Sequence, residues 1–130
     1  MTVRLLATFA SLGLPAGDIL AQGSAETDRA ALVALYDATD GPNWNNSTNW
    51  LTDAPLSDWH GVSTDGNGRV TELILFRNDL KGPLPSDLGR LTRLRRLNLN
   101  QNELTGPIPD ELSALVSLEG LSLALSLIHI

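Results

Sequence analysis

The sequence predicts an α/β solenoid, in which each coil contributes one short strand and one helical turn, preceded by a cap made of a helix and a hairpin. Three observations predict this fold. A block of residues repeats along the chain, so that Asn78 recurs as Asn102 and Gly82 recurs as Gly106. The apolar positions keep the same spacing, and a helical pattern with two strand patterns precedes the first block. Self-similarity at a period of roughly 20–50 residues is the sequence signature of a solenoid.

The repeats have a specific wording. Residues 70–93 read VTELILFRNDLKGPLPSDLGRLTR, residues 94–117 read LRRLNLNQNELTGPIPDELSALVS, and a partial third repeat covers residues 118–124. Both complete repeats fit LxxLxLxxNxLxGxIPxxLxxL, so the chain resembles the plant-type leucine-rich repeat family. The resemblance implies a curved, right-handed coil with short parallel strands on its concave face. It also implies that this face binds a protein, peptide or glycan.

Each position of the repeat has a physical reason in such a coil. Strand leucines alternate, so Leu73 and Leu75 point to one side, and their equivalents one and two coils later should stack on them. The buried amides of Asn78 and Asn102 should satisfy backbone groups where the chain turns. Residues 86–91 and 110–115 should form short helical turns on the outer face.

Residues 26–69 read as the N-terminal cap. Residues 28–39 have helical apolar spacing, with Thr27 as the expected N-cap and Gly41 as the expected stop. Strands are expected over residues 59–64 and 69–75, joined by the turn sequence Asp-Gly-Asn-Gly. Such a cap should cover the open core end of the first coil.

The cap itself resembles the domain that precedes plant-type repeats. Plant versions carry two cysteines around a Trp-x-Gly-Val segment, whereas Ser57 and Thr64 occupy those positions here, and the chain has no cysteine. The sequence of the cap is similar to a cysteine-free bacterial form of this domain. Packing of Trp44, Trp50 and Trp59 must then replace the disulfide.

The two ends of the chain carry different sequence signals. Residues 1–25 resemble a secretory signal peptide, which predicts a secreted or cell-surface bacterial protein; the alternative is a disordered leader or a misplaced start. No membrane span is expected, since the apolar run is short. Residues 125–130, LSLIHI, resemble a translated sequencing adapter, because Ser126 replaces the expected asparagine. The chain is then an N-terminal fragment, and the alternative is a genuine degenerate last coil.

Composition argues against several functions. The formal charge of −6 disfavours nucleic acid, and the arginines between residues 90 and 96 are expected to form a solvated edge. His60 and His129 have no partner at triad or metal spacing, so neither an enzyme nor a cofactor nor a metal site is expected. The turn at residues 65–68 fails as a calcium loop, because Ser63 and Ile74 occupy the first and last ligand positions.

The expected ligand site is the set of residues between and just after the strand leucines: Glu72, Ile74, Phe76, Arg77, Arg96, Asn98, Asn100 and Gln101, continued by Gly120, Ser122 and Ala124. Phe76 is either an exposed contact or packs back on the cap, and both readings stay open. A binding module is the first hypothesis. The alternatives are the sensor part of a receptor or enzyme, and a structural or adhesive surface repeat. The uncapped last coil predicts some self-association.

Overall fold

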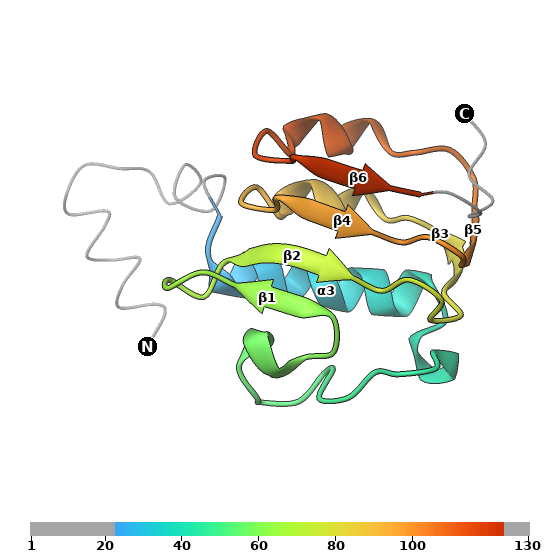
Figure 1. The fold of residues 1–130 in the computed structure, drawn as a ribbon, viewed down its shortest axis with the longest axis horizontal. Coiled ribbons are helices and arrows are strands. Elements are labelled where there is room, and N and C mark those ends of the chain that lie inside the picture. Colours follow the sequence, from blue (N-terminus) through green and yellow to red (C-terminus); the bar gives the residue numbers. More distant parts are fainter. Residues whose placement is uncertain (1–22, 124–130) are drawn as a thin grey trace.

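The computed structural model describes residues 23–123 and has one layer of strands backed by helical turns (Figure 1). Most of the expected signal segment, Ala124 and the 125–130 tail lie outside these residues. The elements in chain order are α3 (Ala25–Ala38), η1 (Gly41–Asn43), η2 (Leu56–Asp58), β1 (Val62–Thr64), β2 (Val70–Ile74), β3 (Lys81–Pro83), η3 (Ser86–Arg90), β4 (Arg96–Asn98), β5 (Glu103–Thr105), η4 (Asp110–Ala114) and β6 (Gly120–Ser122), where η marks a 3₁₀ turn.

The main sheet has the strand order β1-β2-β4-β6. β1 and β2 form the expected antiparallel hairpin, and β2, β4 and β6 run parallel in a register that places Leu73 beside Leu97 and Leu97 beside Leu121. The sequence repeat is therefore the structural repeat. A small parallel pair of β3 and β5 at the other end of each coil was not expected.

The core lies between the sheet and a layer made of α3, η3 and η4 (Figure 1). The strand leucines of the first two coils are almost completely buried, as at Leu73, Leu75, Leu97 and Leu99. Full burial of such a side chain contributes about 1.5–3 kcal/mol. Leu121 does not match its equivalents: it remains 47% exposed, because β6 is the outermost strand of this sheet among the described residues.

The start of α3 differs from the prediction. Ser24, rather than Thr27, is the N-cap, and its hydroxyl accepts the backbone N–H of Thr27 at 3.2 Å. Thr27 returns a hydrogen bond by accepting the Ser24 backbone N–H at 2.7 Å. The two residues form a reciprocal capping box, in which Thr27 fills the place more often held by Glu or Gln.

The end of α3 also differs. The helix stops at Ala38, with Thr39 as its C-cap, and Asp40 takes the left-handed backbone conformation at φ 62°. Gly41 is needed for space, since a Cβ there would overlap the ring of Tyr36. Asn43 stabilises this reversal by donating its side-chain N–H to the Asp40 carboxylate at 3.0 Å.

An aromatic cluster holds the cap together. Trp50 lies between Trp44 and Trp59, with ring centroids 4.8 Å and 5.1 Å away, and Tyr36 closes the cluster 5.2 Å from Trp44. Each indole N–H donates to a backbone carbonyl, as that of Trp50 does to His60 at 2.9 Å. Aromatic packing and hydrogen bonds thus hold together a cap that has no disulfide.

An asparagine ladder joins the cap to the coils. The side chain of Asn102 accepts the backbone N–H groups of Asn78 and Leu80 at 3.0 Å each and donates to the Leu75 carbonyl at 2.9 Å. Asn78 repeats this arrangement towards the cap, donating to the Asn46 carbonyl at 2.9 Å and accepting the Asn46 N–H at 2.8 Å. The cap loop therefore serves as the coil that precedes the first repeat.

Candidate binding face

The predicted ligand residues occupy the exposed side of the main sheet. Parallel pairing places Glu72 beside Arg96 and Ile74 beside Asn98, and Gly120 and Ser122 continue these two rows on β6. Backbone bonds continue the alignment past the strand ends, because the Arg77 N–H donates to the Asn100 carbonyl at 2.9 Å. We call this surface the sheet face, defined by Glu72, Ile74, Phe76, Arg77, Arg96, Asn98, Asn100, Gln101, Gly120 and Ser122.

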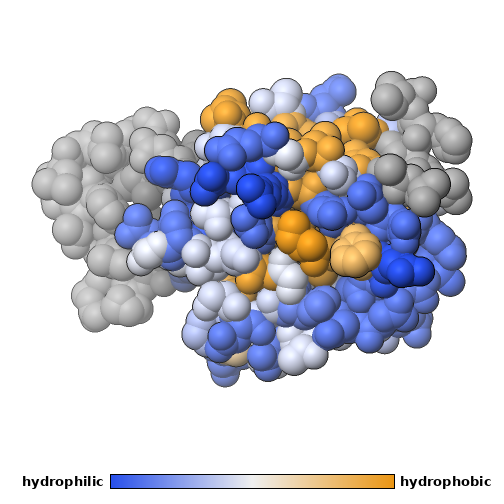
Figure 2. Space-filling view, viewed as in Figure 1, coloured by the Kyte–Doolittle hydropathy of each residue, from blue (hydrophilic) through white to orange (hydrophobic). Residues whose placement is uncertain are grey.

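Charged side chains gather near the starts of the parallel strands. Arg96 lies 3.9 Å from Glu72, and Arg95 lies 3.1 Å from Glu119, with all four side chains open to solvent. The hydrogen bond from Arg95 lowers the pKa of Glu119 below its ordinary value, and the same bond raises the pKa of Arg95. The area around these four side chains is strongly hydrophilic, as the deep blue area of Figure 2 shows.

Apolar side chains lie next to this charged area. Phe76 is 50% exposed, so it does not pack fully onto the cap, and Ile74 is half-buried beside it. Figure 2 shows the resulting orange patch over the middle of the sheet. The sheet face therefore offers apolar and polar contacts side by side.

The sheet face is hollowed between β2, β4 and β6. The hollow has a volume of about 210 Å³ and is lined by Ile74, Arg96, Leu97, Asn98, Gly120 and Ser122. Gly120 lies opposite Arg96 in the strand register and contributes no side chain, which leaves this part of the face open.

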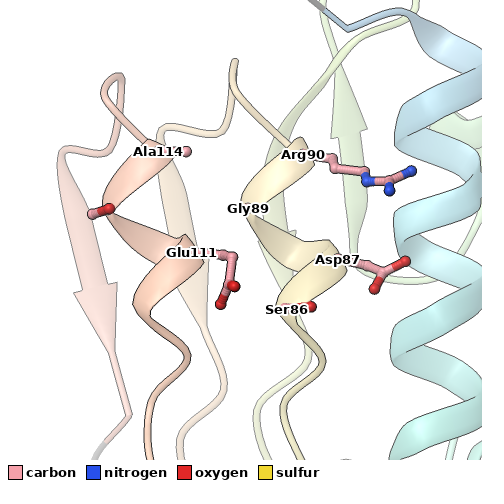
Figure 3. A pocket seen from close by; sticks show the side chains of 7 residues that line it. Ser86, Asp87, Gly89, Arg90, Glu111 and Ala114 are labelled. Carbon is pink, nitrogen blue, oxygen red and sulfur yellow. The ribbon is translucent and has the colours of Figure 1, made fainter. Parts of the chain in front are cut away.

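Two other hollows lie away from the sheet face. One of about 310 Å³ separates η3 from η4, where the Glu111 side chain points towards η3 while Asp87 and Arg90 point towards α3 (Figure 3). The other, of about 460 Å³, is lined by Asp65, Thr71, Arg93, Arg95, Ser117 and Glu119. Neither lining contains a histidine, and within residues 23–123 no three His, Asp or Glu side chains are placed to hold a metal ion.

The turn of the hairpin is stabilised from within. The Asp65 carboxylate accepts the backbone N–H of Asn67 at 2.8 Å and that of Arg69 at 3.1 Å. These two bonds lower the pKa of Asp65 below its ordinary value, and the bond from Arg69 has the larger effect.

His60 is the one histidine of the described residues, and its backbone makes hydrogen bonds within the cap. Its N–H donates to the Thr48 carbonyl, and its carbonyl accepts from the indole N–H of Trp50.

Sequence reasoning missed a buried ion pair. Asp28 and Arg69 pair at 2.8 Å with almost no exposure, the Val70 N–H donates to Asp28 at 2.9 Å, and Arg69 also donates to Thr92 at 3.0 Å. This group ties α3 to β2 and to the first coil. A usable signal was present, since Asp28 stands four residues before Leu32 and so lies in the apolar stripe of the helix.

Comparison with known proteins gives consistent findings. The Leucine Rich Repeat family model matches residues 93–115. Phytosulfokine receptor 2 of Arabidopsis thaliana is 36% identical over 86 residues, which cover 64% of this chain and 8% of the receptor. The BIR2 ectodomain from Arabidopsis thaliana superposes with a TM-score of 0.68 at 31% identity, covering 76% of this chain and 55% of that one. The Arabidopsis receptor kinase HAESA, solved with the peptide hormone IDA and the co-receptor SERK1, gives a TM-score of 0.68 at 28% identity over 78% of this chain and 17% of the other.

Together, the repeats, the sheet and these similarities support a leucine-rich repeat protein of the plant type, with the leucine-rich repeat fold. The chain spans less than a tenth of the curated receptor's length and about half of the BIR2 chain. Among residues 23–123, no helix combines the length and apolar character needed to cross a bilayer.

Proposed function

We propose that this chain is a non-catalytic binding module that recognises a peptide or protein through the sheet face, which forms the concave side of the solenoid. One observation carries the proposal: the register of the parallel strands arranges exposed apolar and polar side chains in continuous rows, while the alternate leucines of the first two coils are buried. Exposed aromatic groups beside arginines are typical of interface hot spots. The similarity to HAESA, solved with a peptide hormone, supports the same ligand class.

The proposal extends to the protein's location. We infer a secreted or cell-surface protein. The resemblance of residues 1–25 to a signal peptide supports this, as does the similarity to a receptor ectodomain. The resemblance of the cap sequence to a cysteine-free bacterial form supports a bacterial source.

A second candidate function is the sensor part of a larger receptor. Two observations favour it: the curated relative is named a receptor, and the matched HAESA structure is that of a receptor kinase. In this reading the sheet face still binds the ligand, and an effector elsewhere in the protein responds to it.

The binding function can be tested with defined probes. The full chain is immobilised and selected against a displayed library of randomised linear dodecapeptides and, separately, against a glycan array. Selected peptides should bind the unchanged chain and lose at least tenfold in affinity to Phe76→Ala, because removal of an interface aromatic costs about 1.4 kcal/mol or more.

The matched control is Val116→Ala, which removes an 84% exposed apolar side chain outside the sheet face. That variant should bind as the unchanged chain does. If no peptide is enriched, the peptide-binding proposal is contradicted, and enrichment on the glycan array alone would replace it with carbohydrate recognition.

A further inference from the structure

We propose that the hollow in the sheet face is a subsite for a carboxylate side chain, Asp or Glu, of an extended peptide that continues over Phe76. This inference rests on the proposed peptide-binding function and names the chemistry that one part of the sheet face recognises. Its basis is the set of polar groups that line the hollow and the open space left by Gly120.

The polar groups of the hollow are mainly hydrogen-bond donors. The Asn98 side-chain oxygen accepts the backbone N–H of Asn100 at 3.0 Å, which leaves the Asn98 amide N–H₂ to donate. Ser122 also lines the hollow, and its hydroxyl can donate a hydrogen bond. A ligand group that accepts several hydrogen bonds at once fits this lining.

Arg96 selects a charged acceptor. Its guanidinium lies 3.9 Å from the Glu72 carboxylate, beyond hydrogen-bond distance, and both side chains are open to solvent at 63% and 36%. Arginine can bind a carboxylate through two parallel N–H groups, which are among the strongest polar contacts in proteins. A ligand carboxylate over Gly120 would meet Arg96 from the side opposite Glu72, because Glu72 and Gly120 flank Arg96 in the register.

The surroundings of the hollow favour a side chain over a chain end. Apolar surface continues from Ile74 to Phe76 on one side, and the charged groups Arg95 and Glu119 lie on the other. A peptide that crosses the sheet face can use both areas only if it continues past the hollow. Phe76 lies four residues beyond Glu72 and two strands from Gly120, about 16 Å away, so at ~3.3 Å per residue an apolar side chain about four to six positions from the carboxylate would reach Phe76.

Gly120 makes the subsite testable without unfolding the protein. Its φ lies outside the left-handed region, and an added Cβ would meet only the Arg96 Cγ, at 3.9 Å, an ordinary van der Waals contact. Gly120→Val should therefore fill the hollow and leave the sheet intact. Gly66→Val is the matched control, because a Cβ at Gly66 meets nothing within 4 Å and the residue lies in the hairpin turn.

The experiment uses the full chain and the randomised dodecapeptide library. Selected peptides should share an Asp or Glu about four to six positions from an aromatic or aliphatic residue. A synthetic copy of one selected peptide should lose affinity about tenfold to a hundredfold for Gly120→Val and Arg96→Gln, the range expected for loss of a charge-assisted contact. Gly66→Val and Arg90→Gln should bind it unchanged, and all four variants should keep the unfolding midpoint of the unchanged chain.

The peptide itself distinguishes the sources of the carboxylate. Replacing its shared Asp by Asn, or its Glu by Gln, should lower the affinity, whereas amidation of its C-terminus should not. The subsite is overturned if amidation alone abolishes binding, or if Gly120→Val binds as tightly as the unchanged chain. In both cases peptides are still bound, so the proposed function stands; failure to select any peptide contradicts the proposed function instead.

Discussion

Replacement of Asn102 by alanine tests how the coils are joined. Asn102 is 4% exposed, and both the oxygen and the nitrogen of its side-chain amide form hydrogen bonds. The oxygen accepts the N–H groups of Asn78 and Leu80, and the nitrogen donates to the carbonyls of Leu75, Leu99 and Asn100 at 2.9, 3.0 and 3.2 Å. Alanine removes all five contacts together.

The expected loss follows from the groups left behind. Two backbone N–H groups lose their acceptor, and each buried donor without a partner costs about 1–3 kcal/mol. Asn102→Ala should therefore lower the free energy of unfolding by about 2–6 kcal/mol. That is a large fraction of the total for a domain, which is about 5–15 kcal/mol.

Urea unfolding followed by tryptophan fluorescence measures this loss, since all three tryptophans lie in the cap. The matched control is Asn43→Ala, which removes an exposed amide that donates only to Asp40. The control should change the free energy of unfolding by less than about 0.5 kcal/mol. Equal midpoints for the two variants would refute the ladder as a stabilising connection between cap and coils.

Three further predictions follow from the cap and the hairpin. Trp59→Ala should destabilise the chain by about 3–5 kcal/mol in the same urea assay, because it removes a fully buried side chain from the aromatic cluster. Asp28→Asn should cost about 3–5 kcal/mol, because it leaves the Arg69 charge buried without its partner. The pKa of the Asp65 carboxyl, measured by NMR, should lie below its ordinary value, since the backbone N–H groups of the turn bind its ionised form. Its folded pKa is lowered, so its contribution to stability is present above the unfolded pKa and is lost as the pH falls through the folded value.

Each of these predictions has a contrary result. An unchanged urea midpoint for Trp59→Ala would exclude a structural role for that ring. If Asp28→Asn is as stable as the unchanged chain, the amide replaces the carboxylate as the partner of Arg69. A measured Asp65 pKa at or above the ordinary value of an aspartate would contradict the hydrogen bonds of the turn.

The repeat made much of the fold predictable. A strict period places equivalent residues side by side in a stack, so the pairing of Leu73 with Leu97 follows directly from the sequence. The hairpin was also predictable, since the turn sequence between β1 and β2 is a strong local signal. Both features depend on regularity or on neighbours in the chain.

The sequence patterns did not predict the contacts that lack such regularity. Asp28 and Arg69 are 41 residues apart and belong to different patterns, so neither pattern indicates their pairing. Ser24 was missed as the N-cap because a capping box with threonine in place of glutamate or glutamine is a weak signal. The sheet-face residues follow from strand alternation, but the hollow depends on the absence of a side chain at Gly120 opposite Arg96, which only the register reveals.

Hydrogen–deuterium exchange on the full chain, with and without a library-selected peptide, tests whether the sheet face is the ligand site. Slower exchange should be confined to the segments that carry the sheet face, which are β2, β4, the residues that follow them to Gln101, and β6. η3 and η4, on the opposite side of the core, should exchange at unchanged rates. Protection at η3 and η4 with none at β2 and β4 would contradict a ligand site on the sheet face.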